Sequence, residues 1–192
     1  MAGTINKKRI QKEIFNNRAV KKMVLDIVQK EVEKEKALFK QDFESHPVTQ
    51  EIEGGENASN ISGTLGGYGN LFSFLGFNNG SNPTTPVKFL IQSISVAKNV
   101  RVSASGFQFK VNIPSKEQFG AVSKMPWEGG RSWLLDVERG ISGLGAFLYG
   151  RFLGSRSGGG IQSKYNYSNK RFRNVKYFSE MYAKFIRRLG AK

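Results

Sequence analysis

The chain of 192 residues contains no cysteine, a single histidine and no long apolar run. The absence of cysteine excludes disulfides, thiolate chemistry and cysteine-based zinc sites. No apolar segment reaches the length of about 18 residues that a membrane span requires, and the N-terminus lacks an apolar segment of the secretory type. We therefore expect a soluble protein made in the cytosol, with no membrane partner.

Residues suited to catalysis or metal binding are also scarce. The only histidine, His46, stands beside Pro47, and a lone histidine there is far more often a capping or surface residue than a general base. Asp136 and Glu138 are two residues apart, which on a helix directs them to different faces. The Gly-rich stretch 154–160 lacks the Gly-Lys-Ser/Thr ending of a phosphate-binding loop. We expect no enzyme, no cofactor and no metal.

Acidic residues are few relative to basic ones, 15 against 30, which gives a net charge of +15. Basic residues outnumber acidic ones by 11 to 7 over residues 1–46, by 6 to 5 over 47–130 and by 13 to 3 over 131–192. A basic surface of that density usually meets nucleic acid, an acidic membrane or an acidic protein. A solvated basic face with no partner is the alternative.

Residues 164–178 interleave Lys and Arg with Tyr and Phe. Such a mixture suits single-stranded nucleic acid, because bases stack on aromatic rings while cations hold phosphates. It suits a protein interface equally well, since Tyr and Arg are enriched there. The candidate contacts to nucleic acid or to an acidic partner are Arg156, Lys164, Arg171, Arg173 and Lys176.

The apolar patterns predict one α+β domain over residues 1–192. Residues 1–46 have helical periodicity and predict one long helix, bent near Asn16–Asn17 and ended by Pro47. Residues 87–192 are expected to form an antiparallel sheet of about three to five strands followed by C-terminal helices. The last of these helices, over residues 174–189, has an apolar stripe of Phe178, Tyr182, Phe185 and Leu189.

The strands are predicted between residue 87 and Pro114. Residues 87–96 are rich in β-branched and aromatic residues and predict a central strand. Two later alternating series, 100–104 and 107–113, are out of phase, which indicates a turn or bulge at Ser105–Gly106. With a second turn near Lys98–Asn99, the expected arrangement is a meander.

Residues 54–86 are rich in Gly, Asn, Ser and Thr and predict a long loop or arm. The arm contains an apolar island with Phe72, Phe74 and Phe77, and aromatic residues at that density should be buried somewhere. The island is expected either to fold back over the core or to insert into another subunit. The three phenylalanines are therefore candidate subunit contacts.

Both tryptophans lie in the segment 125–140, where two glycines precede an apolar run. Ser132 is a candidate cap for a helix over residues 133–148. We expect Trp127 and Trp133 to join sheet to helix, with Arg131, Glu138 and Arg139 available to pair across a subunit boundary. These five residues complete the set of candidate subunit contacts.

Two segments stand at characteristic places in the order of parts: residues 46–52 (HPVTQEI) follow the first helix, and residues 133–140 (WLLDVERG) follow the predicted sheet. With these two segments, the order of parts resembles that of the head-to-tail joining proteins of tailed bacteriophages, a group that includes neck, tail-completion and tail-terminator proteins. The sequence departs from the family pattern at Gln50, where the family has Gly, and at Leu135–Asp136, where it has Tyr-Ala.

The resemblance implies a structural virion protein that forms a homo-oligomeric ring at the phage neck or tail top. Its partners would be neighbouring virion proteins, either portal and adaptor or tail tube and sheath, and packaged DNA. The alternative is a basic nucleic-acid-binding protein of ribosomal or chromosomal type, whose affinity would fall steeply with salt.

Overall fold

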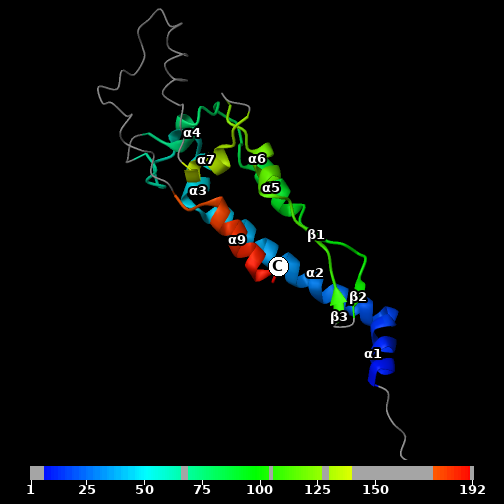
Figure 1. Ribbon diagram of the computed structural model, residues 1–192. Helices are drawn as coiled ribbons and strands as arrows, with labels where there is room; N and C mark the ends of the chain where they lie inside the picture. The colour runs from blue at the N-terminus through cyan, green and yellow to red at the C-terminus, as the bar shows by residue number, and fades with distance from the viewer. Residues whose placement is uncertain (1–6, 66–68, 104–105, 127–129, 140–174, 191–192) are drawn as a thin grey trace, which may run out of the picture.

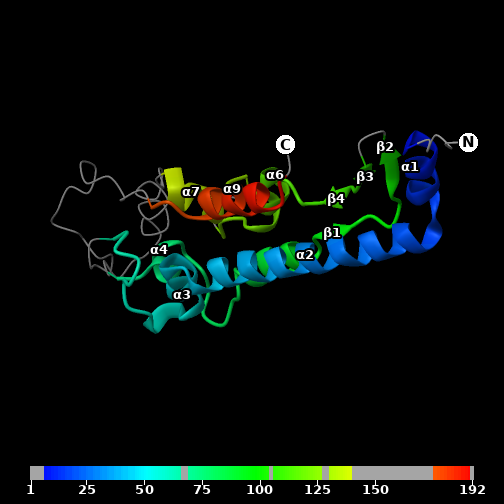
Figure 2. The same cartoon turned by 90° about the horizontal axis from the view of Figure 1, so that it is seen from below.

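The computed structural model describes residues 7–65, 69–103, 106–126, 130–139 and 175–190. The fold is mixed helix and sheet, as the sequence predicts, and the molecule is elongated (Figure 1). We call one end the shaft: helix α1, the part of helix α2 up to Lys30, and the hairpin of residues 94–113. The remaining described residues form the head, as Figure 2 shows from below.

The two N-terminal helices confirm the predicted bend and the predicted end. Helix α1 covers Lys7–Asn16 and α2 covers Arg18–Ser45. Asn17 interrupts them in an extended conformation, and its side-chain oxygen accepts hydrogen bonds from the amides of Ala19 and Val20. His46 is also extended, and helix α3 (Pro47–Glu53) begins directly after it.

The core of the head lies between α2 and the C-terminal helix α9 (Phe178–Arg188), which confirms the predicted last helix. The two helices run antiparallel, because Lys184 Nζ lies 2.9 Å from Asp42 Oδ2 and Arg188 Nε lies 3.7 Å from Glu35 Oε2. Phe39 is at the centre of this core and stacks on Phe185 with ring centroids 5.0 Å apart. Helix α6 (Lys116–Val122) contributes Phe119, whose ring packs against those of Phe39 and Phe178.

The described part of residues 54–86 folds back over the core. It contains a 3-10 turn, η1 (Gly55–Asn57), and a short helix, α4 (Leu71–Phe74). The buried carboxylate of Glu51 holds this segment, accepting hydrogen bonds from Asn60 Nδ2 at 2.9 Å, Ser62 N at 3.0 Å and Leu71 N at 2.7 Å. The apolar island was expected either to fold back over the core or to insert into another subunit, and in the structure it folds back over the core.

The predicted central strand over residues 87–96 is wrong for most of its length, because helix α5 covers Thr85–Gln92. Pro86 lies in its first turn, where proline is tolerated. The residues that α5 and its end bury, Val87, Ile91 and Ile94, recur at spacings of four and three. That spacing belongs to a helix, although the residue types are typical of strands.

The sheet is one antiparallel hairpin in two short ladders rather than a meander. Strand β1 (Ser95–Val96) pairs with β4 (Val111–Asn112), and β2 (Arg101–Ser103) pairs with β3 (Gly106–Gln108). The pairing of Ser103 with Gly106 confirms a turn near Ser105–Gly106. The predicted turn at Lys98–Asn99 is wrong, since four residues there face two on the partner strand, which is a bulge.

Helix α7 covers Trp133–Arg139 and begins directly after Ser132. Ser132 caps it as predicted, because its hydroxyl accepts a hydrogen bond from Leu135 N at 3.3 Å. The same hydroxyl lies 2.6 Å from that of Ser123, at the end of α6. The rest of the helix predicted over 133–148 lies outside the described residues.

Candidate protein-interaction surface

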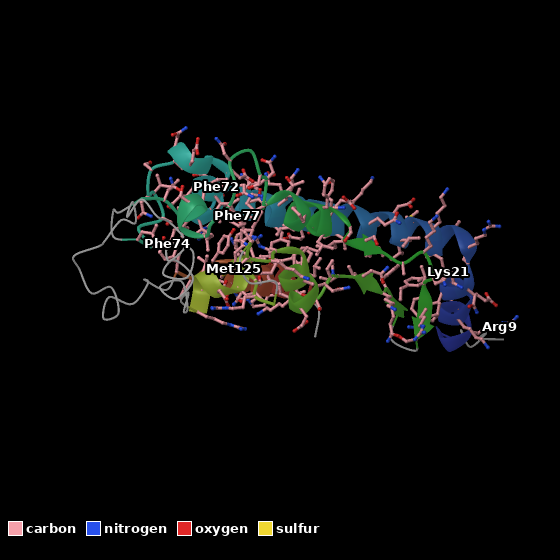
Figure 3. The ribbon with its side chains drawn as sticks, turned by 90° about the horizontal axis from the view of Figure 1, so that it is seen from above. Arg9, Lys21, Phe72, Phe74, Phe77 and Met125 are labelled. Atoms are coloured by element: carbon pink, nitrogen blue, oxygen red, sulfur yellow. The ribbon has the colours of Figure 1, made fainter. Side chains whose placement is uncertain are left out.

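Phe72, Phe77 and Trp133, three of the predicted subunit contacts, meet inside the head. Phe72 and Trp133 are buried. Phe77 joins them, with its ring centroid 5.6 Å from that of Phe72 and 6.2 Å from that of Trp133. Figure 3 shows Phe72, Phe74 and Phe77 grouped at the end of the molecule far from Arg9. Phe74 is half-buried beside them.

Two of the charges predicted to pair across a subunit boundary pair within the chain. Arg131 Nε lies 2.7 Å from Asp136 Oδ2. Glu138 accepts a hydrogen bond from the backbone amide of Ser179, at the start of α9. Both interactions fasten α7 inside the head. Arg139 and Lys176 are exposed, while Trp127, Arg156, Lys164, Arg171 and Arg173 lie outside the described residues.

The joint between α2 and α3 contains the only histidine. His46 Nδ1 accepts a hydrogen bond from Val48 N at 3.2 Å and thereby caps α3, while its ring lies 4.7 Å from that of Tyr177. Burial lowers the pKa of His46, against a backbone hydrogen bond at Lys176 that raises it. Burial also raises the pKa of Tyr177 above its usual range. These groups fit a structural joint.

The shaft has an apolar surface that sequence reasoning missed. Met23 and Ile27 are 63% and 60% exposed, and their spacing of four places them on one face of α2. Val28 and Val32, on the other side, pack against the core. The N-terminal half of α2 therefore has apolar residues on two sides, and the core of this chain covers one of them.

More exposed apolar side chains follow along the shaft. Ile10 and Ile14 on α1 are close to half exposed. Phe15, on the same helix, packs edge-on against Phe107 of the hairpin with ring centroids 5.1 Å apart, and this contact holds α1 to β3. In the described part of the chain, the large exposed hydrophobic residues are five on the shaft and three on the head: Ile10, Ile14, Met23, Ile27 and Val102, then Ile61, Phe89 and Val122.

The shaft is also strongly basic. Residues 7–30 and 94–113 contain eleven Lys and Arg against two acidic residues, which gives +9. The described head has twelve of each and is neutral. Arg9 and Lys21 mark the basic end in Figure 3. Apolar side chains surrounded by cations suit a protein surface that is apolar at its centre and acidic at its edge.

Helix α5 of the head has an exposed apolar residue with carboxylates near it. Phe89 is 67% exposed, the largest fraction among the exposed hydrophobic residues of the described chain. Beside it Lys88 Nζ lies 2.7 Å from Glu53 Oε1 and 3.2 Å from Glu44 Oε1. Burial alone would lower the pKa of Lys88, but its hydrogen bonds with Glu53 and Glu44 raise it.

The described residues contain no group of three His, Cys, Asp or Glu side chains able to hold a metal ion. Across the same residues, the helices are too short or too polar to cross a membrane. No family model, curated protein or solved structure matches the chain.

Proposed function

We propose that this chain is a structural, non-enzymatic subunit of a bacteriophage head-to-tail joint, which assembles as a ring at the neck or tail top. The observation that carries the proposal is the uncovered apolar face of α2, where Met23 and Ile27 are more than half exposed. A single chain that builds a well-packed head and leaves such a helix face in water is suited to assembly with other chains. The resemblance of residues 46–52 and 133–140 supplies the phage context.

The elongated shape supports a role in a ring. A closed ring requires a heterologous contact, in which two different surfaces of identical chains meet. The shaft and the head of this chain are two such surfaces, far apart along α2 and different in charge (Figure 2). The proposed partners are further copies of the chain and the neighbouring virion proteins, with packaged DNA beside the basic surfaces.

The test has two parts. Negative-stain microscopy and sedimentation of the purified protein should show rings at high protein concentration. Mass spectrometry of purified phage particles from the genome that encodes the chain should detect it in the virion. A protein that stays monomeric at every concentration and is missing from the particles contradicts the proposal.

The charge of +9 on the shaft favours a second candidate, a nucleic-acid-binding protein. Binding of this kind weakens steeply as salt rises, because it releases counterions from the phosphates. Lys22→Glu together with Lys30→Glu should then abolish retention of a DNA duplex, whereas Met23→Ser should not change it. The virion proposal is favoured if the Met23→Ser variant fails to form rings and the unmodified protein does not bind DNA.

A further inference from the structure

We infer that the shaft of one copy docks on the α5 face of the next copy, where Met23 and Ile27 meet Phe89. The inference rests on the proposed function, since it identifies the two surfaces that close the ring. Both surfaces have an apolar centre with charges at the edge. The signs of those charges decide the pairing.

Contact between two shafts is disfavoured by charge. Each shaft has a net charge of +9, and like charges brought together in an interface oppose association. Lys22 and Lys30 are exposed beside Met23 and Ile27 on the same helix, with the one carboxylate of Asp26 between them, so an apolar contact between two shafts would bring more cations than carboxylates together. The occupant of the shaft must therefore be neutral or acidic at its edge.

The α5 face meets that requirement. Phe89 is its exposed centre, and beside it the carboxylates of Glu44 and Glu53 balance the ammonium groups of Lys88 and Lys40, with Lys40 Nζ 3.8 Å from Glu44 Oε1. The edge of this face is therefore neutral, and Glu44 and Glu53 keep side-chain exposures of 37% and 34%, so both are accessible to the cations of a neighbouring shaft. Lys22 and Lys30 of the neighbouring shaft are positively charged, opposite in sign to the carboxylates of Glu44 and Glu53. Aromatic residues, Phe among them, are also enriched in protein interfaces.

The contact cannot form within one chain. Helix α5 is placed along the second half of α2, because Lys36 Nζ donates to the carbonyl of Gln92 at 3.4 Å while Lys88 reaches Glu44. Phe89 thus lies near residue 40 of α2. At a rise of 1.5 Å per residue, Met23 is roughly 25 Å away along the same helix.

The absence of cysteine makes a disulfide crosslink a clean test. Met23→Cys and Phe89→Cys are made as separate single variants, and one of them has a size tag. The two are mixed at a concentration where the unmodified protein is oligomeric, oxidised with copper phenanthroline and run on a non-reducing gel. We expect a crosslinked dimer of the two variants in the mixture. When either variant is oxidised alone, we expect no crosslinked dimer.

Each other outcome has a defined meaning. Crosslinking of Met23→Cys with itself would overturn the inference in favour of a two-fold contact between shafts. Rings that form without any crosslink in the mixture would also overturn it and leave the proposed function standing. A preparation that contains only monomers would contradict the ring itself, and with it the proposed function.

A second variant tests the same contact without oxidation. Phe89→Ser should reduce ring formation while the melting temperature stays unchanged, because the side chain is mostly exposed. Ile61→Ser is the matched control, since Ile61 is an exposed apolar residue elsewhere on the head. Equal assembly of the Phe89→Ser variant and the unmodified protein would show that the α5 face is not the docking surface.

Discussion

The phenolic oxygen of Tyr177 lies 2.6 Å from the hydroxyl oxygen of Thr49, inside the head, and both residues are fully covered. The two residues are 128 positions apart in the sequence. This bond links α3 to the segment that leads into α9. It therefore fixes how the beginning and the end of the chain meet.

Removing only one partner of this bond should be costly. Thr49→Val leaves the buried phenol without its partner and should lower the free energy of unfolding by about 1–3 kcal/mol. Thr49→Val combined with Tyr177→Phe removes both polar groups and should cost much less than the sum of the two single changes. Urea unfolding of the four proteins measures the coupling. Strict additivity would show that the bond contributes nothing.

Two phenylalanines should differ sharply when each is replaced by alanine. Phe39 is fully buried among four aromatic rings, so Phe39→Ala should lower the free energy of unfolding by about 3–5 kcal/mol. Phe89→Ala removes a mostly exposed ring and should change it by less than about 0.5 kcal/mol. Chemical denaturation checks both. Similar losses would contradict the assignment of Phe89 to the surface.

Stability should depend on pH through His46. Because burial lowers its pKa below the ordinary 6.5, the folded chain favours the neutral ring. Its contribution is fully present above pH 6.5 and is lost as the pH falls through the folded-state pKa. His46→Asn keeps an N-cap that does not titrate and should flatten this part of the profile of melting temperature against pH. An unchanged profile would show that other groups cause the dependence.

The carboxylate of Glu51 should hold in place the residues that donate hydrogen bonds to it, Asn60, Ser62 and Leu71. Glu51→Gln replaces one carboxylate oxygen with an NH2 group that cannot accept, so either the bond from Ser62 N to Oε2 or the bond from Leu71 N to Oε1 is lost. Amide hydrogen exchange at one of these two residues should therefore accelerate. Glu56→Gln is the control, because Glu56 accepts a bond from exposed Asn79 at the surface. Equal exchange in both variants would contradict the anchoring role.

Asn17 should set the stability of the joint in the shaft. Asn17→Ala removes the hydrogen bonds to Ala19 N at 2.8 Å and Val20 N at 3.3 Å. The loss of such a cap costs about 0.5–2 kcal/mol. Circular dichroism during thermal unfolding measures it, with Asn16→Ala as the neighbouring control. A larger loss from Asn16→Ala would place the cap one residue earlier.

Local signals predicted the parts of the fold that depend on local chemistry. Asn17 and Pro47 delimit α2, and the stripe from Phe178 to Leu189 predicts α9, because capping and periodicity act over a few residues. Residues 87–92 misled the prediction, since their β-branched and aromatic character outweighed the helical spacing of Val87, Ile91 and Ile94.

The candidate site was harder to predict because burial depends on distant partners. Phe77 packs against Trp133, more than fifty residues later in the sequence, and no short-range pattern indicates that contact. The apolar face of the shaft did have a signal. Met23 and Ile27 lie opposite the buried face, so residues 19–28 are apolar on two sides, which a count of apolar positions on one face does not detect.

The antiparallel packing of α9 on α2 determines when the head can fold during synthesis. Asp42 and Lys184 are 142 positions apart, and contacts of such long sequence separation form late. Until α9 leaves the ribosome, Phe39 lacks the rings of Phe178, Tyr182 and Phe185, and the α9 side of α2 is uncovered. The nascent chain is then prone to aggregate, so its yield in the cell should depend on chaperones that hold α2 until α9 arrives.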